Sequence, residues 1–172
     1  VLLKPINTSN LHDTINSILH VGKANRNKEI TNDFSIHEFE QLLAGSKVLL
    51  VEDNEINMEL AIELLADVNI KADCAHNGLE AVELVKLNTY DCVLMDIQMP
   101  EMDGLTATRK IREDVKNKSL PILAMTAHAM KGEREKSIAA GMNDHITKPI
   151  DTLIFYKALV KHIKGENLEH IQ

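Results

Sequence analysis

The feature that most constrains the fold is an alternation, repeated through most of the chain, between short apolar runs and stretches with helical periodicity. The first run, Val48-Leu49-Leu50-Val51, is apolar at every position, which is typical of a strand buried on both faces of a parallel sheet. In the stretch that follows, Ile56, Leu60 and Leu64 recur at the spacing of one helix face. Together they predict a strand followed by a helix.

Five such strand–helix units are predicted between residues 46 and 164. The other strands are expected at 70–75, 90–95, 121–126 and 144–147, and the other helices at 78–87, 104–114, 133–140 and after Asp151. This order predicts an α/β fold, a doubly wound parallel sheet with right-handed crossovers and helices on both faces. In such a sheet the ligand site lies beyond the carboxyl ends of the strands.

Composition excludes several classes of function. The 172 residues include 19 basic and 26 acidic side chains, for a formal net charge of −7. This balance argues against nucleic-acid partners and direct membrane contact, because such surfaces need clustered Lys and Arg. Two cysteines and no signal peptide fit a reducing compartment, so a cytoplasmic location is expected. Because the chain starts with Val1 rather than Met, we expect a longer parent protein.

Polar residues follow the predicted strands at the edge where a ligand site is expected. They are Glu52 and Asp53 after the first strand, Asp96 after the third, Thr126 after the fourth and Lys148 after the fifth. Three close carboxylates repel one another unless a cation lies among them, and Mg²⁺ suits such oxygen ligands. A lysine and a hydroxyl beside them complete a site for a phosphoryl group, with Asp96 as the nucleophile candidate. Any one of these residues alone would more often be structural, since Asp and Glu at strand ends start turns and cap helices.

Four stretches carry a resemblance to a known family. They are Val48-Leu49-Leu50-Val51-Glu52-Asp53-Asn54, Val93-Leu94-Met95-Asp96-Ile97-Gln98-Met99-Pro100 with Met102-Asp103-Gly104, Ala124-Met125-Thr126-Ala127, and Lys148-Pro149-Ile150. With this order and spacing, residues 46–164 resemble the receiver domain of two-component response regulators. The resemblance implies a flavodoxin-like (βα)5 fold with strand order 2-1-3-4-5.

The resemblance also implies the chemistry of the site. Asp96 would accept a phosphoryl group from a phosphohistidine. Mg²⁺ would be held by Glu52, Asp53, Asp96 and the backbone carbonyl of Gln98. Lys148 would contact the phosphoryl oxygens.

Two positions are implied as switch residues. Thr126 would also contact the phosphoryl group, and its movement would repack the neighbouring helix and strand. His145 stands where the family often has Tyr or Phe, which puts the usual coupling between threonine and aromatic ring in doubt. Histidine at this position is common in receivers of hybrid histidine kinases, so the departure points to that subgroup.

The first part of the chain repeats a motif of the last part. Lys4-Pro5-Ile6 matches Lys148-Pro149-Ile150, and apolar residues recur at the same offsets after each: Leu11, Ile15 and Leu19, and Phe155, Leu159 and Ile163. This favours residues 1–19 as an N-terminal helical extension, the remnant of a preceding receiver-like domain in a parent with tandem receivers. The alternative is that Lys-Pro before an amphipathic helix arises by chance.

The stretches outside the predicted receiver have simpler interpretations. Residues 20–45 are expected to be a linker with one short helix, which begins at a capping box of Ser35 and Glu38. Residues 165–172 are expected to be a tail.

The sequence therefore predicts a phosphoacceptor receiver domain from a hybrid histidine kinase rather than a stand-alone enzyme. Its expected partners are a histidine kinase core, a histidine phosphotransfer domain or both. A parent that is anchored in a membrane would carry this module on the cytoplasmic side. One alternative is an interaction module of the same fold that is not phosphorylated. Another is a response regulator whose output domain lies outside this chain. A flavin-binding flavodoxin is disfavoured because the first strand–helix loop lacks a Ser/Thr/Gly-rich phosphate cradle.

Overall fold

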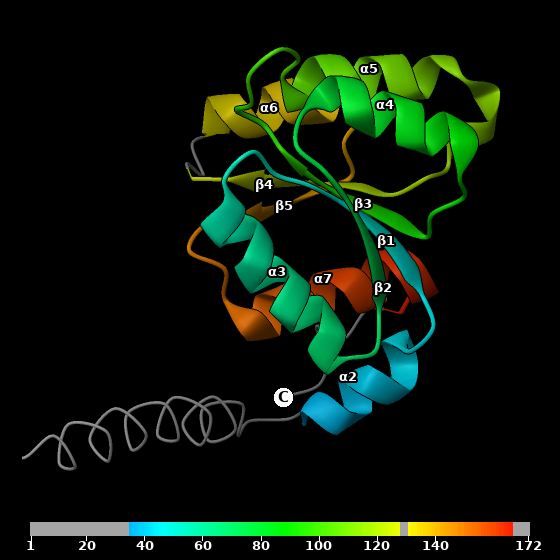
Figure 1. Cartoon of the computed structure of the whole chain (residues 1–172), viewed down its shortest axis with the longest axis vertical. Helices are drawn as coiled ribbons and strands as arrows, with labels where there is room; N and C mark the ends of the chain where they lie inside the picture. The colour runs from blue at the N-terminus through cyan, green and yellow to red at the C-terminus, as the bar shows by residue number, and fades with distance from the viewer. Residues whose placement is uncertain (1–34, 128–130, 167–172) are drawn as a thin grey trace, which may run out of the picture.

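A computed structural model describes residues 35–127 and 131–166, which form one parallel sheet covered by helices on both faces (Figure 1). The strands are β1 (Lys47–Val51), β2 (Lys71–Ala75), β3 (Cys92–Asp96), β4 (Ile122–Thr126) and β5 (Asp144–Thr147). They lie in the order β2-β1-β3-β4-β5. The predicted α/β class and strand order are therefore confirmed.

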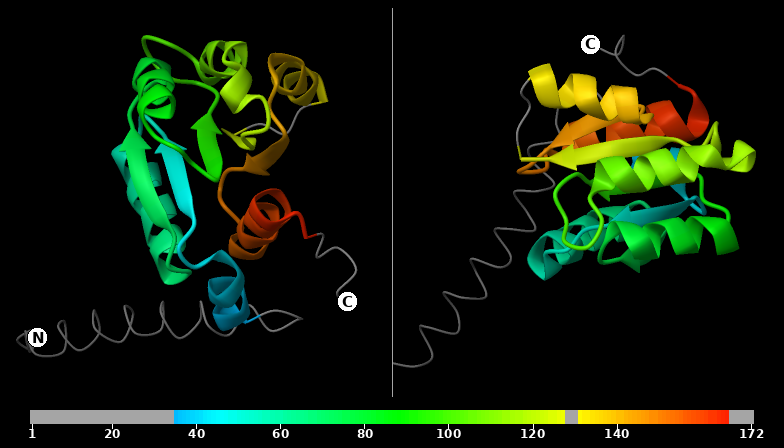
Figure 2. Two further views of the ribbon diagram at one scale, coloured as in Figure 1. Left: turned by 90° about the vertical axis from the view of Figure 1, so that its right-hand side faces the viewer. Right: turned by 90° about the horizontal axis from the view of Figure 1, so that it is seen from above.

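The helices alternate with the strands as predicted. They are α2 (Ile36–Leu43), α3 (Glu55–Asp67), α4 (Gly78–Leu87), α5 (Gly104–Glu113), α6 (Lys131–Ala140) and α7 (Thr152–Lys164), with a short 3-10 helix at Val115–Asn117. α4, α5 and α6 lie over one face of the sheet, and α3 and α7 lie over the other (Figures 1 and 2). Within the described ranges, no helix is long and apolar enough to cross a membrane.

Side-chain caps fix where the helices begin. Asn54, Asn77, Asp103 and Asp151 each accept a hydrogen bond from a backbone N–H in the first turn of the helix that follows. These bonds satisfy donors that a helix start leaves without partners. The capping box predicted at Ser35 is also present, with its backbone N–H donating to Glu38 Oε2 at 2.7 Å.

Alternate strand residues pack into two separate apolar clusters. Val48, Leu50 and Leu94 lie in the cluster beneath α3 and α7. Leu49 and Val93 lie in the opposite cluster, beneath α4 and α5. Because all five are fully buried, β1 and β3 are covered on both faces. A polar side chain on either strand can therefore reach solvent only where the strand ends.

The strand starts differ slightly from those predicted. Ile70 and Tyr90 are buried but lie outside the sheet ladder, and both make polar contacts of another kind. Ile70 N donates to Leu65 O at 3.0 Å, in the turn after α3. Tyr90 Oη donates to Asp73 Oδ2 at 2.7 Å.

The helix α2 lies in the predicted linker but packs against the core of the receiver fold. Its Phe39 and Leu43 are fully buried in the cluster that contains α7, and the rings of Phe39 and Tyr156 lie 5.2 Å apart. We therefore propose that α2 belongs to the folded unit, which then includes residues before position 46. The remnant predicted at residues 1–19 lies outside the described residues, as does most of the predicted tail.

We expect Phe39→Ala to lower the free energy of unfolding by about 3–5 kcal/mol, the usual cost of removing a buried aromatic ring. Urea unfolding of the whole chain measures this change. Gln41→Ala, on the exposed face of the same helix, is the matched control and should stay within about 0.5 kcal/mol of the unaltered protein. Equal, small effects of both substitutions would contradict the inclusion of α2 in the folded unit.

Candidate functional site

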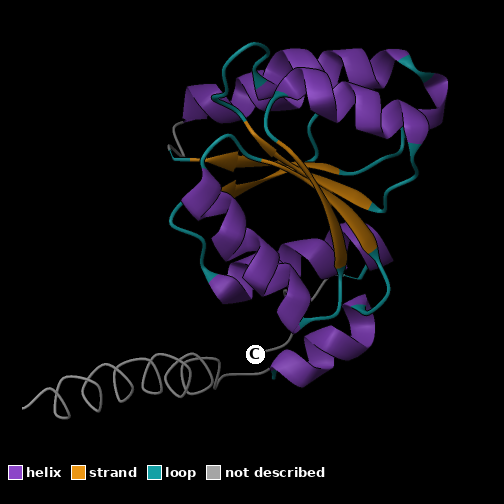
Figure 3. Ribbon diagram, viewed as in Figure 1, coloured by secondary structure: helices purple, strands orange, loops and turns teal. Residues whose placement is uncertain are grey.

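The polar residues predicted at strand ends meet at one edge of the sheet. All five strands run in parallel toward this edge (Figure 3). Asp96 and Thr126 are the last residues of β3 and β4, and Glu52 directly follows β1. Each of these three is less than a tenth exposed. Three buried polar side chains so close to an apolar sheet need compensating partners.

Three carboxylates form the centre of the site. Glu52, Asp53 and Asp96 each offer one oxygen atom, and these oxygens all lie within 4.8 Å of one another. Glu52 and Asp96 are buried, whereas Asp53 is exposed, so the cluster opens to solvent at Asp53. Burial raises the pKa of Glu52, and the charge of Asp96 raises it further, while Lys148 acts in the opposite direction.

Lys148 is the cation that joins two of these carboxylates. Its Nζ donates to Glu52 Oε2 at 2.5 Å and to Asp96 Oδ2 at 2.8 Å. Burial alone would lower the pKa of Lys148, but the hydrogen bonds that it donates to its two carboxylate partners outweigh burial, and the pKa is raised. The backbone N–H of Lys148 donates to Thr126 O at 2.8 Å, which fixes this residue to the end of β4.

Further groups orient the carboxylates. Asn57 Nδ2 and Asn54 N both donate to Glu52 Oε1, each at 3.3 Å. Gln98 N donates to Asp96 Oδ1 at 3.1 Å. Asn57 is not among the site residues predicted above, although a polar side chain in the first turn of the helix after Glu52 is a signal that the sequence contains.

Thr126 and His145 both contact α6, through different partners. Thr126 Oγ1 donates to Glu133 Oε2 at 3.5 Å. His145 Nε2 shares a hydrogen bond with Ser137 Oγ, one helical turn further along. Burial lowers the pKa of His145, and the charge of Arg134 lowers it further, against the effect of Asp144. Neither Glu133 nor Ser137 was singled out from the sequence.

The arrangement has the chemistry of a site for a hard divalent cation and an anionic group. Carboxylate oxygens suit Mg²⁺, which is held by few protein ligands and keeps places for water and phosphate. The fit is supported by the geometry of the cluster, because one oxygen from each of three carboxylates lies within 4.8 Å of the others. Lys148 and Thr126 lie beside the cluster, and each carries a group that can donate a hydrogen bond to an anion.

Comparisons with known sequences agree with this geometry. Residues 48–162 match the family model described as the response regulator receiver domain. Hybrid signal transduction histidine kinase B of Dictyostelium discoideum is 43% identical over 129 residues, which are 68% of this chain and 7% of that protein. The histidine-protein kinase BarA of Escherichia coli K12 is 33% identical over 167 residues, 97% of this chain and 17% of that protein. The chain thus spans less than a fifth of these relatives.

Among the solved structures with the same fold, one receiver domain contains magnesium and another is in complex with a phosphotransfer protein. The receiver domain of sensor histidine kinase PA1611 from Pseudomonas aeruginosa PAO1, with magnesium coordinated in its active site cleft, has a TM-score of 0.66 at 35% identity. The match covers 72% of this chain and all of that one. The complex of the Saccharomyces cerevisiae phosphotransfer protein Ypd1 with the receiver domain of Ssk1 has a TM-score of 0.67 at 28% identity, covering 76% and 97%.

The family match covers well over half of the chain, and the fold and strand order agree with it. This chain belongs to the response regulator receiver domain family of two-component signal transduction.

Proposed function

We propose that the chain is a phosphoacceptor, in which Asp96 takes a phosphoryl group from a phosphohistidine. The observation that carries the proposal is the position of the Asp96 carboxylate. It ends β3, accepts hydrogen bonds from Lys148 Nζ and Gln98 N, and lies within 4.8 Å of two further carboxylates. A lone acidic residue that merely started a turn would not need this set of partners.

In this transfer the site supplies the acceptor carboxylate and the hydrogen-bond donors, and the phosphohistidine partner supplies the phosphoryl group. A carboxylate oxygen of Asp96 forms the new P–O bond while the P–N bond of the donor breaks. The electron pair leaves with the imidazole nitrogen, which takes up a proton. Lys148 and Thr126 would then donate hydrogen bonds to the phosphoryl oxygens, so the bridge between Lys148 and Asp96 would be exchanged for a contact with the new anion.

A magnesium ion would be held by Glu52, Asp53, Asp96 and the backbone carbonyl of Gln98. When bound, it supplies positive charge that offsets the phosphoryl oxygens. The support in this chain is the carboxylate cluster itself, together with the exposure of Asp53, which leaves room for water ligands.

Thr126 and His145 are proposed as the switch residues. Both residues contact α6, so a movement of Thr126 would alter its contact with the same helix that His145 contacts through Ser137. A switch of this kind is a local charge change that biases the position of one element. Because His145 is held by a polar partner, it would not act as the inward-swinging aromatic that is common in the family.

The partner and the parent are also proposals. A histidine phosphotransfer domain or a kinase core would be the donor of the phosphoryl group. The support is that the chain shares its fold with a receiver solved in complex with a phosphotransfer protein. Ile56, which is 77% exposed in the first turn after the site, offers an apolar contact for such a partner. A hybrid kinase as the parent agrees with the name of one relative, hybrid signal transduction histidine kinase B.

We also propose that residues 1–19 are the remnant of a preceding receiver-like domain. The support is the repeated Lys-Pro-Ile motif and its matching apolar offsets. The match to BarA covers 97% of the chain and therefore extends into this segment.

We expect phosphoramidate and Mg²⁺ to add one phosphoryl group to the chain, detected by intact mass. Asp96→Asn should abolish the adduct, because the amide is a poor nucleophile. Glu101→Gln, an exposed residue of the same loop, is the matched control and should keep it. An unaltered chain that gains no adduct from this donor or from a phosphorylated histidine phosphotransfer protein would contradict the proposal and favour an interaction module.

Mg²⁺ should stabilise the chain by about 2.7 kcal/mol when its concentration is a hundred times its dissociation constant. Asp53→Asn should remove most of this gain, measured by urea unfolding with and without Mg²⁺. In EDTA the variant should be at least as stable as the unaltered chain, because one repulsive charge is gone. Glu55→Gln removes an exposed charge outside the cluster and should keep the full gain; equal gains in all three proteins would contradict the metal assignment.

Lys148→Met should cost about 3–5 kcal/mol in EDTA, since it leaves buried carboxylates without their cation. Saturating Mg²⁺ should restore more stability to this variant than to the unaltered chain, because the ion supplies the missing positive charge. Lys161→Met removes a more exposed ion pair with Asp144 and should change stability by about 1 kcal/mol or less in both buffers. A loss in Lys148→Met that Mg²⁺ does not reduce would show that its charge is not what matters.

A further inference from the structure

We propose that Gly78, at the start of α4, is a positioning residue for the phosphoacceptor site. It holds the loop of residues 97–103, which connects Asp96 to α5, through a backbone contact that no other residue type would allow. The inference rests on the proposed function, because it concerns how Asp96 and the carbonyl of Gln98 are held for Mg²⁺ and phosphate.

Backbone hydrogen bonds close this loop. Within the loop, Met102 N donates to Pro100 O at 2.7 Å, and Gly104 N donates to Ile97 O at 3.0 Å. Another bond comes from outside: Gly78 N donates to Met102 O at 3.0 Å. The start of the loop is tied to the sheet, where Ile97 N donates to Met125 O at 3.4 Å, so it is the position of the far end, at Met102, that depends on the first residue of α4.

The contact at Gly78 leaves no room for a side chain. A Cβ at this position would lie 2.6 Å from Met102 O and 2.9 Å from Ala107 Cβ, closer than real Cβ atoms come to other heavy atoms. The nearer of these is a backbone atom, which cannot turn away as a side chain can. An alanine at residue 78 would therefore push the Met102 carbonyl away from α4.

A second close backbone contact, between Gly104 and Asp96, would transmit this displacement to Asp96. Gly104, two residues after Met102, packs so tightly that a Cβ there would lie 2.1 Å from the carbonyl oxygen of Asp96. At the other end of the loop, Gln98 N donates to Asp96 Oδ1. The loop thus touches both the backbone and the carboxylate of Asp96, so its shift would reach the acidic cluster.

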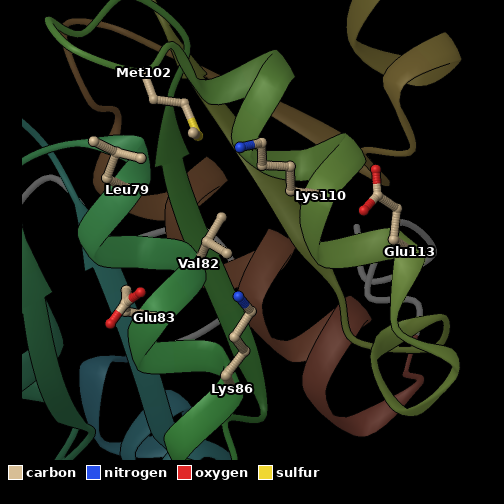
Figure 4. Close-up of a pocket in the computed structure, with 7 residues that line it drawn as sticks. All are labelled: Leu79, Val82, Glu83, Lys86, Met102, Lys110 and Glu113. Carbon is tan, nitrogen blue, oxygen red and sulfur yellow. The ribbon is translucent and has the colours of Figure 1, made fainter.

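Other contacts prevent the loop from absorbing the change. Glu101 already has a left-handed backbone with φ of 64°, which is unfavourable for a residue with a side chain. Asp103 is fixed as the cap of α5, accepting from Thr106 N at 2.9 Å and from Thr106 Oγ1 at 2.8 Å. The side chain of Met102 is buried at one end of a groove of about 290 Å³ between α4 and α5, near Leu79 (Figure 4).

The test compares two glycine-to-alanine substitutions in helices. Gly78→Ala should weaken Mg²⁺ binding at least about tenfold, as substitutions around metal ligands commonly do, and should slow phosphorylation by phosphoramidate. Gly132→Ala, in α6, is the matched control, because a Cβ there meets no atom within 4 Å. It should leave both properties unchanged. Direct Mg²⁺ titration, adduct formation and urea unfolding are measured on the same whole chains.

A double variant separates the loop contact from helix packing. Gly78→Ala with Ala107→Gly removes the clash between the two Cβ atoms but leaves the clash with Met102 O. If Gly78→Ala alone does not fold, Mg²⁺ binding is measured on this double variant instead. We expect Mg²⁺ binding to stay weak relative to Ala107→Gly alone, even where stability recovers.

Two results would overturn the positioning role. One is unaltered Mg²⁺ affinity in folded Gly78→Ala, and the other is recovery of Mg²⁺ affinity in the double variant, which would assign the effect to packing between α4 and α5. Failure of the proposed function is distinguishable, because the unaltered chain itself would then neither bind Mg²⁺ at the cluster nor gain the phosphoryl adduct.

Discussion

Lys148 holds the site together by donating to two carboxylates that reach it from different strands. Glu52 and Asp96 are buried, so without a nearby cation their charges would repel one another in a region that water reaches poorly. The lysine offsets this repulsion at 2.5 and 2.8 Å. It is nevertheless one charge against three close carboxylates. The remaining negative charge favours a divalent cation at the site, and an incoming anion would compete for the hydrogen bonds that Lys148 donates.

The sheet explains why these groups meet at all. β1 and β3 are covered on both faces by apolar clusters, so polar residues are tolerated only where the strands end. Since the strands are parallel, their carboxyl ends share one edge, and side chains far apart in sequence become neighbours. Buried surroundings then strengthen each electrostatic contact. The same rigid sheet is what allows the loop after Asp96 to be positioned by close backbone contacts at Gly78 and Gly104.

Much of this could be predicted from sequence because the signals are local. Continuous apolar runs identified the strands, and the capping box of Ser35 and Glu38 identified the start of α2. The residues at the strand ends followed from the topology. Contacts that depend on three-dimensional packing could not be predicted in this way. These include the burial of Phe39 against Tyr156, the bond between Asn57 and Glu52, and the polar link of His145 to Ser137. The cis peptide before Pro149 also carries no signal in the sequence alone.

The most direct test of the phosphoacceptor role is a crystal structure of the chain with Mg²⁺ and beryllium trifluoride, an analogue of a phosphoryl group. We expect the analogue to be bonded to a carboxylate oxygen of Asp96 and to accept a hydrogen bond from Lys148 Nζ. We also expect Mg²⁺ to contact Glu52, Asp53 and Asp96. An analogue bound elsewhere, or a site in which Mg²⁺ is absent and Lys148 keeps both of its carboxylate partners, would contradict the phosphoacceptor assignment.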